Sequence, residues 1–425
     1  MLVLDEPTAE LDPASSVTVF DLLARYAREH GTTVIVVEQK IALLSDYADM
    51  LVIVDEGRIR FADTPDAVLA HSEELLALGV NGPVRRPHGA QRGRRRGGAE
   101  GGARMIEFKN VSASYDGELA VLADVSFTVN DGDFVAFVGT NGAGKSTTMR
   151  LANGLLKPTS GEVLIDGVPT TSLKTSELAR RIGFLFQNPD RQICCNTVRE
   201  ELMFGFKALG EEGSEAEARV DAMIERFGFD ADAEPYLLNR GTRQLLALAS
   251  IIVLAPPTII LDEPTTGLDF RECVKVMDVV RELNENGTTV IMVCHDMEVV
   301  GDFARRVIAM TAGRVVADGP TFEVLRDGRV LKEAHILPPQ VTEVSLILGR
   351  EAACPAAVAE ANTVAQMVAA VAQAKQMEDE AVAEAAALVD DVAVALAAEV
   401  EATRDAIVEA EAALGDAGAD EEGGR

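Results

Sequence analysis

The stretch that decides the fold is residues 139–147, which read Gly-Thr-Asn-Gly-Ala-Gly-Lys-Ser-Thr. It is a complete G-x-x-x-x-G-K-S phosphate loop, and it follows directly after the apolar run Phe134–Val138. A strand, a glycine-rich loop and a helix in this order turn backbone N–H groups and a helix N-terminus onto a polyphosphate. A glycine turn without a ligand would not need Lys-Ser at these two positions. The sequence therefore predicts a nucleotide site.

Each part of this loop has an expected role. Lys145 can reach the β- and γ-phosphates of a nucleotide, and the hydroxyl of Ser146 can ligate Mg²⁺. The residues that we expect to contact the nucleotide are Gly139, Asn141, Gly142, Ala143, Gly144, Lys145, Ser146 and Thr147.

Two further polar positions follow apolar runs later in the chain. Asp262 and Glu263 end the run Thr258–Leu261, and His295 lies just after Val290–Val293. Because ligands of open parallel sheets gather at the carboxyl edge, these side chains should face the phosphate loop. We expect Asp262 to hold Mg²⁺ through water, Glu263 to polarise the attacking water, and His295 to contact the γ-phosphate.

The pattern of apolar runs predicts an α/β fold. Strand 258–262, helix 270–285 and strand 288–293 follow a βαβ pattern, which indicates a parallel sheet. Residues from about 176 to 250 should be mostly helical. The other expected elements are strands 106–111, 121–129, 134–138, 258–262 and 288–293, and helices 144–155 and 270–285.

An internal repeat is the second decisive feature. Residues 2–12, Leu-Val-Leu-Asp-Glu-Pro-Thr-Ala-Glu-Leu-Asp, parallel residues 259–269, Ile-Ile-Leu-Asp-Glu-Pro-Thr-Thr-Gly-Leu-Asp. Residues 31–39 parallel residues 287–295 in the same way. The second copy has about 157 residues before its Asp-Glu pair, whereas the first has four. We expect the first copy to be a partial domain that is truncated at its N-terminus.

Two segments differ in composition from these copies. Residues 82–104 are rich in Gly and Arg without an aromatic residue, which favours a flexible linker over an RNA-binding segment. Residues 351–425 hold 17 acidic and 3 basic side chains. This tail has helical periodicity, and it could form a coiled-coil seam or a solvated helix. Its apolar stripe consists of Val364, Val368, Val371, Val382, Val389, Val392 and Leu396.

Overall composition excludes several classes of protein. The 425-residue chain has a formal charge of −30, which argues against a mainly nucleic-acid-binding surface. It has no signal-peptide pattern and no uninterrupted span of about 20 apolar residues, so a membrane role would need a partner. The five cysteines lack zinc or disulfide spacing and fit a reducing cytosol. For Cys194-Cys195, ordinary packing is favoured over a redox role.

Residues 105–345 resemble the nucleotide-binding domain of ATP-binding cassette (ABC) proteins. In that resemblance Tyr115 matches the aromatic residue that stacks on adenine, and Gln187 matches the glutamine that ligates Mg²⁺ and senses the membrane partner. Leu268-Asp269 matches the D-loop, and His295 matches the switch histidine. The resemblance implies ATP and Mg²⁺ as cofactors and catalysis by Glu263 and His295. It also implies Ser146, Gln187 and Asp262 as metal ligands.

The fold implied is a P-loop NTPase cassette, with a mainly parallel sheet flanked by helices, an antiparallel β subdomain and a helical subdomain. A partial second cassette precedes it and a helical acidic tail follows. The expected divisions are 1–81 for the partial first cassette, 82–104 for the linker, 105–350 for the complete cassette and 351–425 for the tail.

Two segments are similar to the energy-coupling-factor group of ABC importers: Phe186-Gln-Asn-Pro-Asp-Arg-Gln192 and Ile336-Leu-Pro-Pro-Gln-Val-Thr342. The resemblance implies ATP-driven import of cobalt, nickel or a vitamin at the cytoplasmic face of the cell membrane. Its partners would be a transmembrane permease, a substrate-binding membrane subunit and a second cassette in cis or in trans. The alternatives are a soluble twin-cassette protein acting on ribosomes or chromosomes, and an inactive fragment.

The chain departs from the family pattern at two places. The signature Leu-Ser-Gly-Gly-Gln is replaced by Leu238-Asn-Arg-Gly-Thr242, and the first copy has Gln39 at the switch position. Cassettes of this family pair head to tail, so both departures would fall in the same composite site. We therefore expect one hydrolytic site and one weak site in the parent protein.

Overall fold

The computed structural model describes residues 1–8, 13–38, 41–55, 57–71, 74–75, 78, 105–115, 120–351 and 354–377. The expected linker 82–104, Gln39 and the tail beyond residue 377 lie outside these described residues. The chain divides into two compact units, Met1–Pro339 and Gln340–Arg425. This division lies before the composition change at residue 351.

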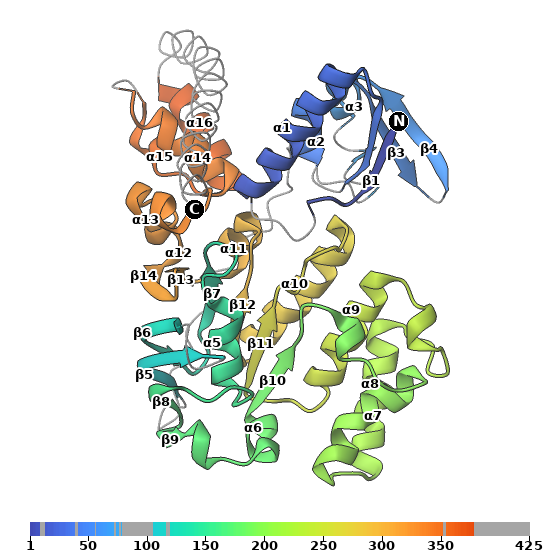
Figure 1. Ribbon diagram of the computed structural model, residues 1–425, viewed down its shortest axis with the longest axis vertical. Coiled ribbons are helices and arrows are strands. Elements are labelled where there is room, and N and C mark those ends of the chain that lie inside the picture. Colours follow the sequence, from blue (N-terminus) through green and yellow to red (C-terminus); the bar gives the residue numbers. More distant parts are fainter. Residues whose placement is uncertain are drawn as a thin grey trace, which may run out of the picture. The chain divides into compact units, whose positions relative to one another are not determined.

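A six-stranded sheet forms the centre of the first unit (Figure 1). Its first five strands in sheet order are parallel, and the last is antiparallel to its neighbour. The predicted parallel α/β sheet is confirmed. In sheet order the strands are β10 Ile182–Leu185, β11 Thr258–Asp262, β12 Thr289–Val293, β7 Phe134–Val138, β13 Arg306–Thr311 and β14 Arg314–Pro320.

Strand β7 is buried on both faces, which explains its uninterrupted apolar sequence. Phe134, Ala136 and Val138 join one hydrophobic cluster, whereas Val135 and Phe137 join another. Alternate side chains of a strand point to opposite faces, so β7 anchors the cores on both sides of the sheet. The phosphate loop therefore follows a strand that is packed on both faces.

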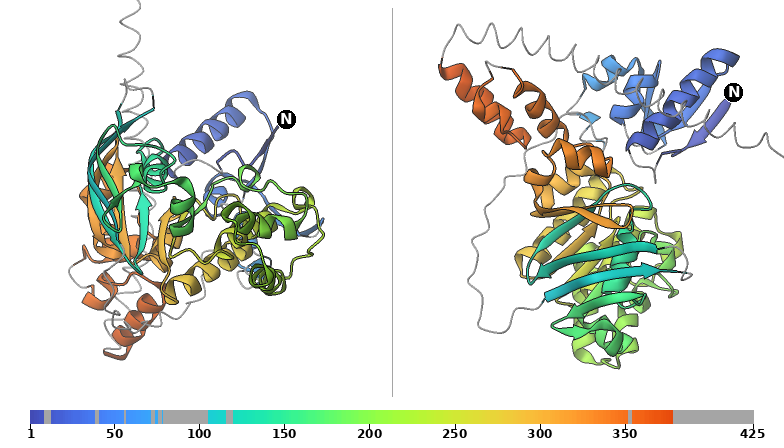
Figure 2. Two further views of the ribbon diagram at one scale, coloured as in Figure 1. Left: turned by 90° about the horizontal axis from the view of Figure 1, so that it is seen from below. Right: turned by 60° about the vertical axis from the view of Figure 1, so that its left-hand side comes forward.

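A second, antiparallel sheet of four strands packs on the Phe137 side. Phe127 stacks on Phe108 with ring centroids 4.4 Å apart and meets Phe137 edge-on at 5.2 Å. Figure 2 shows this layer lying over the main sheet. Its strands in sheet order are β6 Ala120–Asn130, β5 Met105–Ser114, β8 Ser160–Ile165 and β9 Val168–Pro169.

Helices surround the main sheet, and α7, α8 and α9 form a separate helical group opposite β5 and β6 in Figure 1. Local caps fix their ends: the side chain of Thr197 caps α7, and Gly210 ends it in a left-handed conformation. The helices are α5 Lys145–Ala152, α6 Thr175–Arg181, α7 Val198–Leu209, α8 Ser214–Phe227, α9 Arg240–Ile252, α10 Phe270–Glu285, α11 Met297–Phe303, α12 Thr321–Val324 and α13 Gly328–Ala334. Short 3-10 turns are η1 Thr170–Ser172, η2 Pro189–Arg191 and η3 Pro235–Leu237.

The N-terminal segment repeats part of this arrangement. β1 pairs with β2 in parallel, with Asp5 opposite Val37, just as Asp262 of β11 lies opposite Val293 of β12. The hairpin β3–β4 has a register shift at Ile53/Val54, and β13–β14 has its shift at Ala309/Met310. The elements here are β1 Leu2–Asp5, α1 Pro13–His30, β2 Val34–Val37, α2 Ile41–Tyr47, β3 Leu51–Asp55, β4 Arg58–Asp63 and α3 Pro65–Leu69.

The second unit contains three described helices: α14 Gln340–Leu348, α15 Ala356–Ala359 and α16 Val364–Met377. Leu348, Val358 and Ala370 form its small core. Val368 and Val371 of the predicted apolar stripe are exposed, which both interpretations of the tail allow. Within the described residues, no helix combines the length and apolar character needed to cross a membrane.

Candidate nucleotide site

The phosphate loop between β7 and α5 depends on glycine at two positions. Gly139 has φ +134°, and a Cβ there would collide with the carbonyl oxygen of Met310. Gly144 has φ +97°, and a Cβ there would collide with the side chain of Leu122. The left-handed backbone and the close neighbours both exclude larger residues. The loop therefore stays thin, and its backbone can approach a ligand.

Lys145 closes the loop from inside. Its side chain is only 5% exposed, and Nζ donates hydrogen bonds to the carbonyl oxygens of Gly139 at 2.7 Å and Thr140 at 2.9 Å. A buried ammonium group is costly without such partners. The loop thus holds a positive charge beside the N-terminus of α5, where the helix dipole also favours an anion.

A hydroxyl and a carboxylate meet on the other side of the loop. Ser146 Oγ donates to Asp262 Oδ1 at 3.1 Å, which joins the first turn of α5 to the end of β11. Asp262 is 7% exposed, and burial raises the pKa of its carboxyl, although the hydrogen bond from Ser146 acts in the opposite direction. Oxygen ligands of these two types suit Mg²⁺.

Glu263 lies at the centre of the second half of the site. Its backbone is left-handed, with φ +52°, and its N–H donates to the carbonyl oxygen of Val293 at 3.0 Å. Such a conformation is unfavourable for glutamate and persists only when the surroundings impose it. The turn carries the side chain from the end of β11 toward the ends of β10 and β12.

Three side chains converge on the Glu263 carboxylate. Gln187 Nε2 donates to Oε2 at 2.9 Å, and Thr266 Oγ1 donates to the same oxygen at 3.0 Å. His295 Nε2 lies 3.2 Å from Oε1, but its orientation does not give a regular hydrogen bond. The predicted residues Gln187, Glu263 and His295 thus come together, each just beyond one of three neighbouring parallel strands.

The electrostatic surroundings keep Glu263 ionised. Burial by itself would raise the pKa of this carboxyl, but the nearby His295, the hydroxyl of Thr266 and the charge of Lys145 together hold the pKa below its ordinary value. An anionic, partly buried acceptor next to a positively charged phosphate cradle can orient a water molecule and draw its proton.

Tyr115 lies beside the helix that follows the loop. Its hydroxyl is 3.2 Å from Thr147 Oγ1 and accepts a hydrogen bond from Arg150 Nη1 at 3.1 Å, while the residue is 56% exposed. The exposed ring leaves a face open for stacking. Sequence reasoning missed Arg150 and Thr266, because no motif position marks either partner.

The segment that replaces the family signature still begins a helix. Asn239 Oδ1 accepts the N–H of Thr242 at 2.7 Å and caps α9. Arg240 Nη2 donates to the carbonyl oxygen of Thr266 at 3.2 Å. Gly241 lies against the carboxylate of Glu272, which would have to move to make room for a Cβ. Asparagine caps a helix as well as serine does, so this departure preserves the helix N-terminus.

Comparisons with known proteins all find ATP-binding proteins of transporters. The model of a family described as "ABC transporter" matches residues 122–266. A putative ABC transporter ATP-binding protein of Methanosarcina mazei is 34% identical over 83% of this chain and 67% of that protein. The energy-coupling factor transporter ATP-binding protein EcfA of Methanothermobacter thermautotrophicus is 36% identical over 56% of this chain and 78% of that protein.

Coverage differs among these relatives. The chain spans 62–67% of the length of three Methanosarcina relatives. A solved structure of cbiO1 from Clostridium perfringens, described as part of the ABC transporter complex cbiONQ, has a TM-score of 0.49 and 31% identity. That alignment covers 53% of this chain and 92% of cbiO1.

Proposed function

Because this chain belongs to the ATP-binding proteins of ABC transporters, we propose that its residues 105–350 bind ATP with Mg²⁺ and hydrolyse it to energise import across a membrane. One observation carries the proposal. The phosphate loop after β7 and the side chains after β10, β11 and β12 converge at the carboxyl edge of one parallel sheet. Ligands of such sheets bind at this edge.

The residues divide the work as follows. Lys145 and the N–H groups of the loop hold the phosphates, while Ser146 and Asp262 hold Mg²⁺, with Gln187 as a further ligand. A bound Mg²⁺ would neutralise charge on the phosphate oxygens. Glu263 orients the attacking water and accepts its proton, and His295 contacts the γ-phosphate from the end of β12.

Gln187 and Thr266 both donate to Oε2 of Glu263, so Oε1 remains able to accept a proton from the attacking water. Gln187 opens the segment that leads into α7, so a membrane partner that contacts this segment would act on a hydrogen bond that holds the carboxylate. We place the ring of Tyr115 against adenine.

The proposed transporter class is the energy-coupling-factor type, which takes up cobalt, nickel or a vitamin. Two observations support it: the segment Phe186–Gln192, and the similarity to an energy-coupling factor transporter ATP-binding protein over 78% of that protein. ATPase components of this family dimerise and work with transmembrane subunits. The partners would then be a permease, a substrate-binding membrane subunit and a second cassette, at the cytoplasmic face of the membrane.

We further assign residues 1–81 to the end of a first cassette with a weak site. Glu6 has φ +44° and its N–H donates to the carbonyl oxygen of Val37 at 2.8 Å, so its backbone repeats that of Glu263. The turn after β1 therefore has the same backbone conformation at Glu6 as the turn after β11 has at Glu263. The weak site would pair the partial first copy with the altered signature at Asn239.

The substitution Glu263→Gln tests this assignment of the catalytic base. We expect ATP to bind as before, while the ATPase rate falls at least about 100-fold because the amide cannot accept the proton. The exposed Glu285→Gln serves as the matched control and should leave the rate unchanged. Steady-state phosphate release and ATP binding should be measured on the same preparations, and an unchanged rate in Glu263→Gln would exclude Glu263 as the base.

The same assay compares the two copies. Glu6→Gln should reduce the rate by much less than Glu263→Gln, in the natural protein assembled with its partners. An equal loss from both substitutions would contradict the proposed asymmetry.

A further inference from the structure

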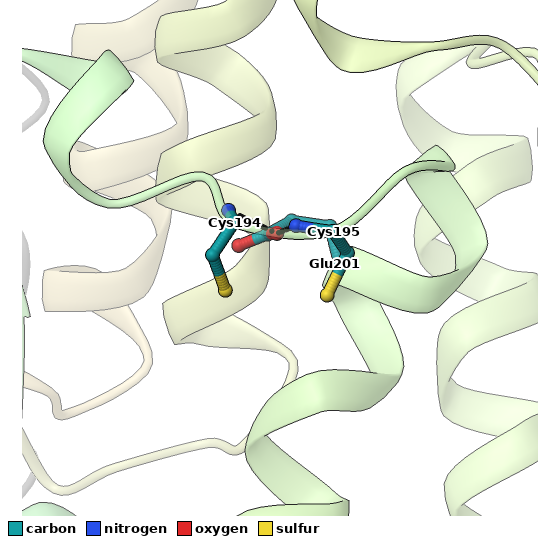
Figure 3. A group of neighbouring side chains, drawn as sticks. All are labelled: Cys194, Cys195 and Glu201. Carbon is teal, nitrogen blue, oxygen red and sulfur yellow. Dashed lines mark hydrogen bonds between the residues drawn. The ribbon is translucent and has the colours of Figure 1, made fainter.

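A group of potential metal ligands lies outside the nucleotide site, just before α7. Cys194 and Cys195 are adjacent in the chain, and Glu201 is in the first two turns of the helix (Figure 3). The two Sγ atoms and a carboxylate oxygen of Glu201 all lie within 4.8 Å of one another. Both cysteines are free thiols.

Glu201 organises this group. Glu201 is only 3% exposed, and its Oε2 accepts hydrogen bonds from the backbone N–H groups of both Cys194 and Cys195, each at 2.9 Å. These bonds fix the dipeptide against the helix and bring both thiols to the carboxylate. Thr197 caps the same helix through the N–H of Glu200, so the short connection between the ligands is itself ordered.

The buried carboxylate of Glu201 forms no ion pair with a Lys, Arg or His side chain among the residues that the structure describes. Burying a carboxylate is costly unless a cation or several hydrogen bonds compensate. Two N–H groups supply part of that compensation, and the Cys195 thiol, which hydrogen-bonds to the carboxylate, supplies more. A cation that displaces the thiol protons would supply a full opposite charge.

The three donors select the kind of cation. Two sulfur atoms favour a soft or borderline metal such as Zn²⁺ or Cd²⁺ over Mg²⁺ or Ca²⁺. Cys194 is exposed and Cys195 is half-buried, so an ion can reach them from solvent. Tetrahedral Zn²⁺ would place its ligand atoms about 3.6–3.8 Å apart, so the side chains would need to close by no more than about 1 Å.

We propose that Cys194, Cys195 and Glu201 bind one thiophilic divalent cation, with a fourth position left open to water. Binding forms two metal–sulfur bonds and one metal–oxygen bond, and the thiol protons pass to solvent. The site is independent of the nucleotide site, because it shares no residue with the phosphate loop or with the partners of Glu263. Its cysteine ligands come from the segment that joins β10 to α7, and its carboxylate comes from α7 itself.

The test measures Cd²⁺ binding to the reduced, nucleotide-free full chain after removal of metals with a chelator. The double variant Cys194→Ser/Cys195→Ser is compared with Cys273→Ser/Cys354→Ser, which loses the same number of thiols. We expect the control to keep wild-type binding of about one thiolate-bound Cd²⁺ per chain, with its ultraviolet charge-transfer absorption, and the first variant to bind at least about tenfold more weakly. Both retain Asp262, Glu263 and His295, so any metal held there cancels in the comparison.

Two further variants guard against a folding artefact. Cys194→Ser changes one exposed side chain and should weaken Cd²⁺ binding while leaving ATP binding intact. Glu201→Gln keeps an oxygen for the two N–H groups but removes the charge, and it should also weaken Cd²⁺ binding about tenfold or more. Equal Cd²⁺ affinity and equal charge-transfer absorption in wild type and Cys194→Ser/Cys195→Ser would overturn the proposal.

Discussion

At the scale of single residues, the site is built from backbone conformations that its side chains do not favour. Glu263 and Glu6 are both left-handed, and Gly139 and Gly144 adopt φ values that other residues rarely reach. For the two glutamates this strain costs about 1–3 kcal/mol at each position and is maintained by the packed strands around them, whereas glycine adopts such φ values without strain. The strain places Glu263 beyond the end of its strand, where its carboxylate can meet Gln187.

Substitutions of two glycines in the phosphate loop distinguish the cost of a left-handed backbone from the cost of a steric collision. Gly142 has φ +79° with open space around a Cβ, whereas a Cβ at Gly139 meets the carbonyl oxygen of Met310. Gly142→Ala should lower the free energy of unfolding by about 1–2 kcal/mol. Gly139→Ala should lower it by at least about 3 kcal/mol, since backbone must also move.

Chemical denaturation of the two variants without nucleotide checks this order. Because ligand is absent, the comparison reports the loop's own packing. A smaller loss for Gly139→Ala than for Gly142→Ala would show that the contact with Met310 is not as tight as the structure has it.

At the scale of elements, the two copies of the βαβ segment differ in how they are covered. Ile260, Ile291 and Val293 are fully buried in a core cluster of the complete copy. Their equivalents in the partial copy, Val3, Ile35 and Val37, are exposed. The same apolar strands therefore contribute very different amounts of burial.

A pair of Val→Thr substitutions measures this difference. Val293→Thr places a hydroxyl in a closed apolar core and should destabilise the protein by about 1–2 kcal/mol. Val37→Thr changes a residue that is 55% exposed, and its effect should stay within about 0.5 kcal/mol. The free energies of unfolding provide the measurement. A loss at Val37 as large as that at Val293 would mean that this face is covered in the protein.

Helix α14 offers a pH-dependent prediction. Burial raises the pKa of Glu343 above its ordinary value, so the protonated carboxyl favours the folded unit. That contribution is complete below the unfolded pKa of about 4.3 and is lost as the pH rises through the folded value. Glu343→Gln should therefore raise the melting temperature of the second unit at pH 7, with the gain disappearing near pH 4. A gain that persists at low pH would have another cause.

Elements with strong local signals could be predicted from the sequence. Strands β7 and β11 and helix α10 have the expected bounds, because long apolar runs and the Asp269 capping box mark them. The helix expected over residues 144–155 ends at Ala152, since Asn153 leaves the helical conformation and Gly154 turns left-handed. Strand β5 continues to Ser114 through register shifts that no periodicity reveals.

The site could be predicted only as far as motifs mark it. The meeting of Ser146 with Asp262 follows from the order of strands in a parallel sheet. The hydrogen bonds of Thr266 to Glu263 and of Arg150 to Tyr115 depend on how loops fold back, which spacing does not determine. The grouping of Cys194, Cys195 and Glu201 could not be predicted from the sequence either, because the spacing of these residues matches no common metal motif.

At the scale of the whole molecule, the chain carries a segment matched by the ABC transporter family model, residues 122–266, and an N-terminal segment that repeats part of its strand pairing. Family membership and the ATPase fold are shown by the relatives and by the sheet itself. The proposed import, the proposed membrane subunits and the proposed asymmetry of the two sites all require that the phosphate loop and the Asp262-Glu263 pair act on one nucleotide.

Binding of ATP by the purified chain in the presence and absence of Mg²⁺ tests that requirement most directly. The control variant is Lys157→Ala, which removes an exposed lysine shortly after the end of α5. The wild type and Lys157→Ala should bind ATP with equal affinity, and both should bind it more tightly when Mg²⁺ is present. Lys145→Ala should bind at least about tenfold more weakly, a loss of about 1.4 kcal/mol or more. Equal ATP affinity in Lys145→Ala and Lys157→Ala, with no response to Mg²⁺, would contradict the account.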